Sequence, residues 1–398
     1  MAVFRPWKLG TASKTMTRRR TNGLGGILLA ASFILTASGV ARAADDEIEI
    51  GMATPLTGPA AESGKYGEWG AELAIAEING QGGVLGRKLK LVIEDDQTTN
   101  PGIVAAFNRL ASNPDIAVFL GSVRSTQVHA MDPDVRRVAK PVFIGGTDPN
   151  LTHMGNPWFF RCRPNDTYSA KVIADFGVHT LGFKKWALVT STDAFGSSGN
   201  KLLTAELSAL GASVVTSQGY ANQTPDFTPV VLAIKGSDAE VIGSYFTYEQ
   251  DLGVFARQLR QLGVRLPWVG SPSITDTAAL HLAGPALWGT YGIADFNADS
   301  SPEAKRYAEA YQAAHHVPAD QFSAWTYDAI HLAAIAIEKA KSTDPKALRE
   351  AILSIRGYHG AEGTYDFDAN GDGLHGYNVV KNDHGKIVFI KRVDFPPP

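Results

Sequence analysis

The sequence predicts an α/β protein in which parallel sheets are covered by helices on both faces. Short apolar strands alternate with amphipathic helices along most of the 398-residue chain. One such helix is marked by Ile103, Ala106, Phe107 and Leu110, which follow the i, i+3, i+4, i+7 spacing of a single buried face. Strands that alternate with helices in this way favour parallel sheets with a helical layer on each side.

The strands fall into two runs, one before about residue 165 and one from about 185 to 293. Each is a short apolar segment bounded by turn residues. The predicted strands are Ile48–Ala53, Leu89–Glu94, Ile116–Leu120, Pro141–Ile144, Trp186–Thr190, Ser213–Ser217, Val241–Ser244 and Pro267–Val269.

The alternation of strands and helices ends in the C-terminal part of the chain. Residues 301–353 show helical periodicity without intervening strands, and short strands return at 363–367, 377–381 and 387–391. A helical segment after two βα runs indicates that the chain crosses back to complete its first lobe. We therefore expect lobe 1 to comprise residues 44–166 and 297–374, and lobe 2 to comprise residues 167–296 and 375–398.

Residues 1–43 have the three parts of a secretory signal peptide. The segment holds no acidic residue and seven basic ones, then an apolar run from Leu24 to Val40, then Ala41-Arg42-Ala43. We expect cleavage near Ala43, with an uncleaved anchor as the alternative. Since no cysteine stands at the cleavage point, the predicted location is free in the periplasm.

The charge balance narrows the class of partner. The chain has 37 Lys and Arg against 40 Asp and Glu, a net charge of −3. Without the seven basic residues of the predicted leader, 30 basic residues stand against 40 acidic ones, a net charge near −10. An acidic exported chain is a poor match for nucleic acid or an anionic membrane.

Two segments suit the binding of a carboxylate. Gly121–Gln127 follows the strand that ends at Leu120, and Gly145–Pro149 follows the strand that ends at Ile144. Open parallel sheets bind ligands at the carboxyl ends of their strands, where helix N-termini present free N–H groups. Hydroxyl and N–H donors form charge-assisted hydrogen bonds with a carboxylate. Plain N-capping by Ser and Thr is the alternative.

A longer series of motifs resembles a known family. In order and spacing it is similar to the leucine/isoleucine/valine-binding protein family, the type I periplasmic binding proteins of branched-chain amino acid ABC importers. The likeness covers nearly all of the chain after the leader. The motifs are Thr54-Pro55-Leu56-Thr57-Gly58-Pro59, a helix end from Ile78 through Gly80-Gln81-Gly82-Gly83 to Arg87, Glu94-Asp95-Asp96, Ser125-Thr126 and Thr147-Asp148-Pro149-Asn150-Leu151-Thr152.

The resemblance implies two Rossmann-like lobes, joined by three crossovers, that close over a ligand. It implies that Ser125, Thr147 and nearby backbone hold the ligand carboxylate. It also implies an aromatic contact from the second lobe and a tyrosine within residues 245–248, where Tyr248 is favoured. The expected ligand-binding residues are Ser125, Thr126, Gly145, Gly146, Thr147, Phe195, Tyr245, Tyr248, Ser273 and Phe322.

One departure from the family pattern concerns the ligand ammonium. Amino-acid-binding members place a Glu shortly after the Gly that ends a second-lobe strand, but this chain has Gly270-Ser271-Pro272-Ser273 there. A buried ammonium without a counter-charge is costly. Either Asp276, Glu249 or Asp251 substitutes, or the ligand has no amine. The many aromatic residues in these segments would suit an aromatic or branched acid.

Other motifs in the sequence are weaker indications of function. Asp366–Asp372 resembles the start of an EF-hand loop, but position twelve is Tyr377 rather than Glu. The glycines of Gly80–Gly86 miss the dinucleotide-binding spacing, and the ten histidines form no metal-ligand pattern. No nucleophile–base arrangement indicates a hydrolase. We therefore expect neither an enzyme nor a cofactor or metal site.

The predicted function is that of a periplasmic solute-binding component of an ABC importer. Its expected ligand is a small carboxylate, either a branched-chain or related amino acid or an aromatic or aliphatic carboxylic acid. The expected macromolecular partner is an inner-membrane ABC permease, and a monomer is expected because the lobes must close freely. A ligand-sensing receptor or regulator of the same fold is the alternative.

Overall fold

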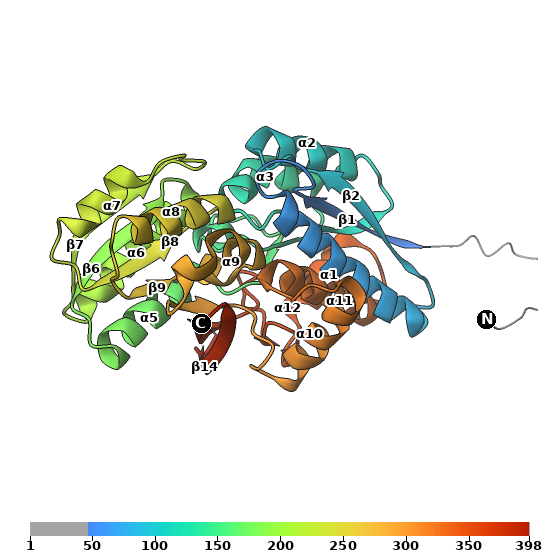
Figure 1. The fold of residues 1–398 in the computed structure, drawn as a ribbon. Helices are drawn as coiled ribbons and strands as arrows, with labels where there is room; N and C mark the ends of the chain where they lie inside the picture. The colour runs from blue at the N-terminus through green and yellow to red at the C-terminus, as the bar shows by residue number, and fades with distance from the viewer. Residues whose placement is uncertain (1–46, 398) are drawn as a thin grey trace, which may run out of the picture. The chain divides into compact units, whose positions relative to one another are not determined.

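The structure, a computed structural model, describes residues 47–397, so the predicted leader lies outside the described residues. Two sheets divide the described chain into two lobes (Figure 1). The first lobe is built on a five-stranded sheet in the order β2-β1-β3-β4-β5, and all of its strand pairs are parallel. Its strands are β1 (Ile48–Thr54), β2 (Leu89–Asp95), β3 (Ile116–Leu120), β4 (Val142–Ile144) and β5 (Phe159–Arg161).

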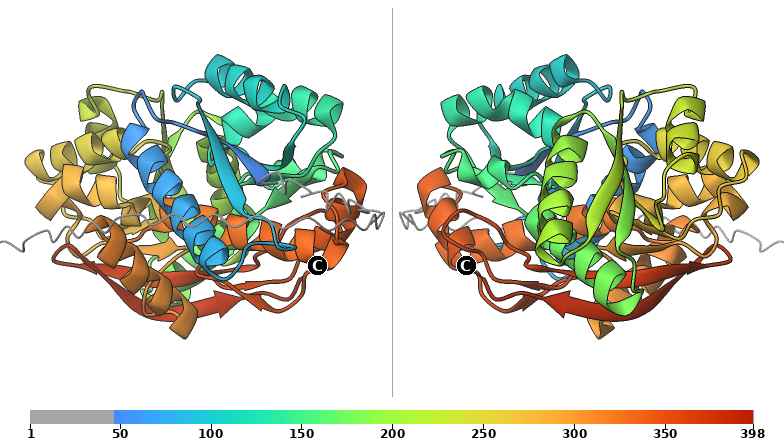
Figure 2. Two further views of the ribbon diagram at one scale, coloured as in Figure 1. Left: turned by 90° about the vertical axis from the view of Figure 1, so that its right-hand side faces the viewer. Right: turned by 90° about the vertical axis from the view of Figure 1, so that its left-hand side faces the viewer.

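Helices cover both faces of this first sheet, as the nearly continuous burial of β1, β3, β4 and β5 requires. The face of Ile48, Ile50 and Met52 packs on α1, α10, α11 and α12, and the opposite face packs on α2 and α3. Figure 2 shows α1 (blue) beside the orange helices that come from far along the chain. The helices are α1 (Ala61–Gly80), α2 (Asn100–Ala111), α3 (Ser125–Val138), α4 (Asn150–His153), α10 (Pro302–His315), α11 (Gln321–Ala340) and α12 (Pro345–Leu353).

The second lobe is built on a seven-stranded sheet in the order β14-β13-β10-β9-β8-β6-β7. Strands β6 to β10 are parallel, whereas β13 and β14 add an antiparallel ribbon at one edge. That ribbon is the long dark red pair in Figure 2. The strands are β6 (Lys185–Ser191), β7 (Ser213–Tyr220), β8 (Val241–Tyr245), β9 (Trp268–Gly270), β10 (Tyr291–Ala294), β13 (Gly376–Asp383) and β14 (Lys386–Asp394).

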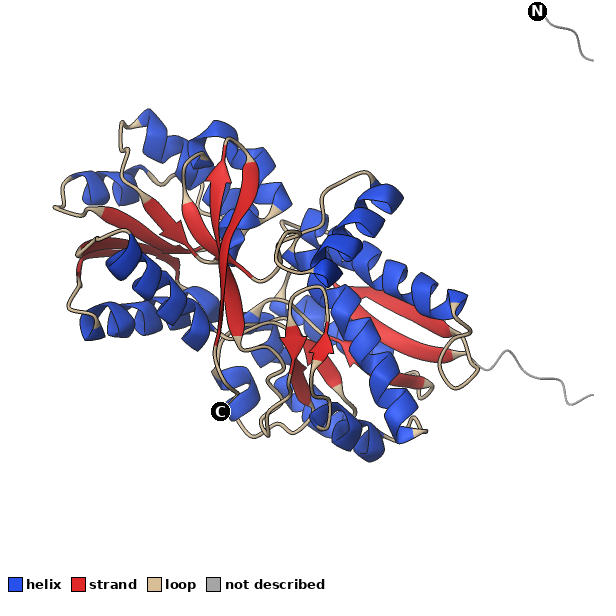
Figure 3. Ribbon diagram, turned by 90° about the horizontal axis from the view of Figure 1, so that it is seen from below, coloured by secondary structure: helices blue, strands red, loops and turns tan. Residues whose placement is uncertain are grey.

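The second sheet also has helices on both faces (Figure 3). Helices α7 and α8 pack on one face, and α5 and α6 pack on the other, around the buried rings of Trp268 and Trp186. The helices are α5 (Asp166–Asp175), α6 (Ala194–Ala209), α7 (Thr228–Lys235), α8 (Glu249–Gln261) and α9 (Thr277–Ala283). None of the helices within residues 47–397 has the length and apolar content needed to cross a bilayer.

The chain passes between the lobes three times: after β5, after β10 and before β13. The core of the first lobe accordingly joins residues 48–162 to residues 296–374. Between the helices and β13, a small two-stranded sheet pairs β11 (Tyr358–His359) with β12 (Thr364–Tyr365). The α/β fold with two parallel-dominated lobes, predicted from the alternation of strands and helices, is confirmed.

Besides the two-residue strand β11, two strands of the main sheets were not predicted from the sequence, and each has a local reason. Strand β5 is only three residues long, and β10 contains Gly292, which lowers strand propensity. Long-range pairing stabilises both: β5 lies beside β4, and β10 is held between β9 and β13. Since β5 leads into Arg163 and β10 into Asp295, both strands matter for the site described next.

Candidate functional site

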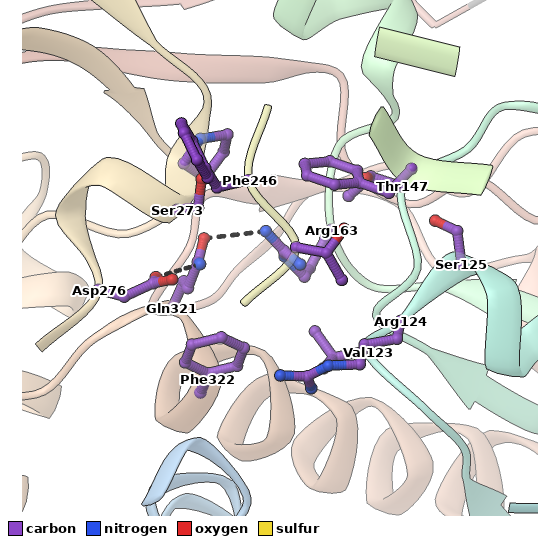
Figure 4. A pocket seen from close by; sticks show the side chains of 13 residues that line it. Val123, Arg124, Ser125, Thr147, Arg163, Phe246, Ser273, Asp276, Gln321 and Phe322 are labelled. Atoms are coloured by element: carbon purple, nitrogen blue, oxygen red, sulfur yellow. Dashed lines mark hydrogen bonds between the residues drawn. The ribbon is translucent and has the colours of Figure 1, made fainter. Parts of the chain in front are cut away.

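A cavity of about 410 Å³, including its opening to solvent, lies where the carboxyl ends of strands from both sheets meet (Figure 4). The first lobe contributes the segments that follow β3, β4 and β5 and the first turn of α11. The second lobe contributes the segments that follow β8 and β9 and the first turn of α6. The lining residues are Val123, Arg124, Ser125, Thr147, Arg163, Gln321 and Phe322 from the first lobe, and Phe195, Phe246, Thr247, Pro272, Ser273 and Asp276 from the second.

Ser125 is placed to donate a hydrogen bond into this cavity. It is the first residue of α3 and only 1% exposed. Its Oγ accepts a hydrogen bond from the backbone N–H of Asp148 at 3.1 Å, which leaves the hydroxyl proton free for another acceptor. The N–H groups of the first helical turn have no intrahelical partner and favour an anion. An anionic ligand group therefore suits this end of the cavity.

The side chain of Thr147 is already engaged. Its hydroxyl donates to Oδ2 of Asp166 at 2.8 Å, so its proton is directed away from the cavity. Burial raises the pKa of Asp166 to about 7, against the opposing effect of the hydrogen bonds from Thr147 and Ser169. Thr147 can donate to a ligand only when Asp166 is protonated and becomes the donor of this pair. The hydroxyl of Thr147 is thus coupled to a titratable group.

Arg124 brings a buried positive charge to the cavity wall. It is 6% exposed, and none of its three guanidinium nitrogens has a hydrogen-bond partner among residues 47–397. Its guanidinium lies over the ring of Tyr248, 4.9 Å from the centroid, and one nitrogen is 3.7 Å from Oε1 of Glu249. The resemblance did not indicate Arg124. The signal in the sequence was an arginine directly before Ser125, four residues after the end of a buried strand.

A second arginine in the cavity wall is fully partnered. Arg163 forms an ion pair with Asp295 and donates to the carbonyl of Gly145 at 3.1 Å and to Oε1 of Gln321 at 2.9 Å. Gln321 in turn donates to Asp276, and Figure 4 shows this chain of hydrogen bonds. Burial, with the nearby charges of Glu249 and Asp320, raises the pKa of Asp276 well above its usual range. Arg163 and Gln321 were not predicted from the sequence.

Five of the ten predicted ligand-binding residues line the cavity, and five do not. Ser125, Thr147, Phe195, Ser273 and Phe322 line it. Thr126, Gly145, Gly146, Tyr245 and Tyr248 do not.

The glycines and Thr126 instead shape the walls. Gly146 lies so close to Leu151 that an added Cβ would be 2.7 Å from that side chain, and Gly145 accepts from Arg163 through its carbonyl. Thr126 accepts a hydrogen bond from the backbone N–H of Ala194 at 3.1 Å, which joins the two lobes. These residues position the cavity rather than line it.

The aromatic residue that β8 contributes to the cavity is Phe246, not a tyrosine. Tyr245 is fully buried, with its hydroxyl 2.8 Å from that of Ser169 and its ring against Gly199. Tyr248 covers Arg124 instead. Neither tyrosine lines the cavity, and the expected tyrosine contact with the ligand stays a prediction. The residues that follow β8 show no regular alternation, since Phe246 and Thr247 both line the cavity, so sequence alone does not fix which residue turns inward.

Of the three acids considered as ammonium partners, only Asp276 lines the cavity. Glu249 lies just behind the wall, where it accepts from Ser63 at 2.6 Å. Asp251 points elsewhere and accepts from the backbone of Gln223 at 2.9 Å, and burial raises its pKa to about 6. Within residues 47–397, no group of three or more His, Cys, Asp or Glu side chains is arranged to hold a metal ion.

A cavity between two α/β lobes, with polar groups at strand ends and aromatic rings around them, defines a solute-binding protein. The model of the periplasmic binding protein family matches residues 47–386, and the chain belongs to this family. Proteins of this family bind solutes and are not enzymes. The family predicted from the sequence motifs is thereby confirmed.

Individual relatives agree with this assignment. A Leu/Ile/Val-binding protein homolog of Brucella melitensis is 30% identical over 89% of this chain and 96% of its own length. A branched-chain amino acid transporter substrate-binding protein of Streptococcus pneumoniae, solved with isoleucine, has a TM-score of 0.82 and 22% identity, covering 87% of this chain and 99% of its own. A solute-binding protein from R. palustris, solved with benzoate, has a TM-score of 0.80 and 21% identity, covering 87% and 96%. At these identities the two solved structures establish the fold.

Proposed function

We propose that this protein is the periplasmic solute-binding component of an ABC importer and that it captures a small carboxylate between its two lobes. Its leader, residues 1–43, is removed on export, and the lobes are residues 44–166 with 297–374 and residues 167–296 with 375–398. The partner is an inner-membrane ABC permease, which recognises the closed form of a monomer. The protein itself catalyses no reaction.

The single observation that carries this proposal is the donor set at the start of α3. Ser125 has a free hydroxyl proton beside the N–H groups of the first helical turn, which have no intrahelical partner. An anionic group is the natural ligand of such a set, because charge-assisted hydrogen bonds are about twice as strong as neutral ones. The rings of Phe195, Phe246 and Phe322 then cover the apolar part of the ligand.

Contacts between the lobes support a closing mechanism. Ser63 of the first lobe donates to Glu249 of the second, and Thr126 of the first accepts from the backbone of Ala194 in the second. Ser198 of the second lobe donates to Asp148 of the first at 3.3 Å. Contacts that join the lobes stabilise the arrangement in which the lobes enclose the cavity. The ligand-sensing regulator is not favoured, because the reported relatives are binding proteins.

Calorimetry on residues 44–398 tests the proposal. The ligand panel contains branched-chain amino acids, their amine-free keto acids and benzoate-type acids. Ser125→Ala is expected to weaken binding of the best ligand by about 10- to 100-fold, because a hydrogen bond to a charged group is worth about 1.5–3 kcal/mol. Ser208→Ala, on an exposed part of α6, is the matched control and should leave affinity unchanged. Equal binding by wild type and Ser125→Ala would remove this serine from the site.

A further inference from the structure

The guanidinium of Arg124 is the feature of the cavity that the binding of a single carboxylate leaves unexplained. Several described residues have buried polar side-chain atoms without a hydrogen-bond partner, and Arg124 is the only arginine among them. All three of its guanidinium nitrogens lack such a partner. The residue is 6% exposed and lines the cavity. Burying a charge without hydrogen bonds is expensive, so such a group is kept where something in the functional state binds it.

The neighbours of Arg124 hold it in place without satisfying it. The ring of Tyr248 covers one face of the guanidinium. The N–H groups lie in the guanidinium plane, so this stacking does not occupy them. The nearest carboxylate, on Glu249, approaches only to 3.7 Å and accepts instead from the hydroxyl of Ser63. A charged acceptor that enters from the cavity could therefore bind the free N–H groups in the planar, bidentate manner typical of arginine.

The side chains of Arg124 and Ser125 face different parts of the cavity. Figure 4 shows the hydroxyl of Ser125 on the side of Thr147, whereas the guanidinium of Arg124 extends past Val123 toward the ring of Phe322. One carboxylate at the Ser125 end therefore leaves the guanidinium unbound.

A hollow beside Arg124 adjoins the first cavity. Its volume of about 260 Å³ includes its opening to solvent, and it shares Val123, Arg124 and Phe322 with the first cavity, so these three residues form the wall common to both. It continues toward the end of β1 and the start of α1, where Ser63 and Thr54 contribute to its lining. A ligand held at Ser125 can thus extend its far end to the guanidinium.

We propose that the ligand is a small acid with two anionic groups, one bound at Ser125 and the start of α3 and the other bound by Arg124. Arg124 is then the residue that selects such ligands against acids with an apolar tail. The inference rests on the proposed function, since it assigns the ligand class of the same cavity. The apolar spacer between the two anionic groups would lie against Val123 and Phe322.

Two acidic residues near the cavity face a neighbouring cation. The negative charge of Asp295 is matched by Arg163, and Glu249 lies 3.7 Å from Arg124 and accepts a hydrogen bond from Ser63. Burial, with the nearby charges of Glu249 and Asp320, raises the pKa of Asp276 well above its usual range. Asp276 can therefore be neutral beside an amine-free acid or ionised beside a ligand ammonium.

Matched ligand pairs test the inference on residues 44–398 by calorimetry. The pairs are pentanedioate and pentanoate, glutamate and norvaline, and terephthalate and 4-methylbenzoate, each differing only by carboxylate against methyl at the far end. Wild type is expected to bind the two-carboxylate member of at least one pair about tenfold or more tighter than its partner. Arg124→Met is expected to abolish or reverse that preference, whereas Arg306→Met, on an exposed part of α10, should preserve it.

The outcomes separate the two levels of the proposal. Tighter binding of the methyl-bearing member by wild type would overturn the inference about Arg124 and leave the proposed carboxylate-binding function standing. A preference that survives in Arg124→Met would also overturn it. Binding of no acid from either panel by folded wild type would remove the proposed function and the inference together. Because the wild-type comparison needs no substitution, a poorly folding variant does not remove the test.

Discussion

Replacing Asp372 by asparagine tests how the C-terminal part of the first lobe supports the carboxylate-binding loop. Asp372 is 2% exposed, and its carboxylate accepts from Nε of Arg161 at 2.7 Å, from Thr152 at 3.0 Å and from Asn165 at 3.0 Å. Arg161 is fully buried and also donates to the carbonyls of Gly146, Asp148 and Pro149. The ion pair therefore ties the loop after β4 to a residue more than 200 positions later in the chain.

The expected loss follows from the burial of both partners. Asp372→Asn keeps the shape of the side chain but leaves the Arg161 charge buried without its counter-charge. Breaking a buried ion pair in this way costs about 3–5 kcal/mol of the free energy of unfolding. Arg161, His153 and Asn165 lower the pKa of Asp372 far below its usual value despite the opposing effect of burial. The contribution of the pair to stability is therefore complete above about pH 4 and is lost progressively as the pH falls below that value.

Urea unfolding of residues 44–398 measures this loss at pH 7 and again near pH 3. The control is Asp238→Asn, which makes the same substitution in the exposed ion pair with Lys185, whose two side chains are 65% and 47% exposed. That change is expected to cost less than about 1 kcal/mol. The difference between the two variants should shrink at the lower pH. A loss for Asp372→Asn no larger than that of the control at pH 7 would refute the reasoning.

Three further predictions concern closure, packing and pH. Ser63→Ala should weaken ligand binding by about tenfold or more in calorimetry, because it removes the hydrogen bond to Glu249 across the lobes; unchanged affinity would show that this contact does not contribute to closure. Gly70→Ala should lower the melting temperature, because its Cβ would stand 2.1 Å from the carbonyl of Ser323, whereas Gly80→Ala in the same helix meets no atom within 4 Å and should be neutral; equal melting temperatures would contradict this packing. Asp166→Asn should gain stability relative to wild type as the pH rises from about 5 to 8 in thermal melts. The reason is that Asp166, with a folded-state pKa raised to about 7, stabilises the wild-type fold at low pH, and this stabilisation is lost as the pH rises through that pKa. Parallel pH profiles of the two proteins would argue against the raised pKa.

Local sequence patterns were sufficient to predict most of the strands and part of the site. The alternation of apolar strands and amphipathic helices fixes a parallel α/β architecture, because each strand needs a crossover helix to reach its neighbour. Ligands of such sheets bind at strand ends, so the segments Gly121–Gln127 and Gly145–Pro149 were predicted from the strands before them, and the family resemblance singled out Ser125 and Thr147 within them. Strand β3 was predicted with its observed bounds, Ile116–Leu120. These features depend on residues close together in the chain.

Only the tertiary structure decided which side chains near the strand ends turn into the cavity. Phe246 lines it although Tyr245 and Tyr248 lie on either side, and Asp276 lines it although Glu249 and Asp251 were equal candidates. The physical reason is that a side chain after a strand end has no periodicity to follow, so packing between the two lobes selects its direction. The exposed or buried state of such a residue depends on partners hundreds of positions away.

The tertiary structure also decided which charged side chains of the cavity wall are paired. Whether an arginine in the wall is free or neutralised depends on where distant acids lie: Arg163 meets Asp295 through an unpredicted strand, while Arg124 finds no hydrogen-bond partner among the described residues. Sequence by itself determined that this is an α/β protein whose strand ends are suited to an anion. The tertiary structure brought residues far apart in the chain together and thereby decided which arginine stays available to the ligand. The reason is that charge pairing depends on distance in space and not along the chain.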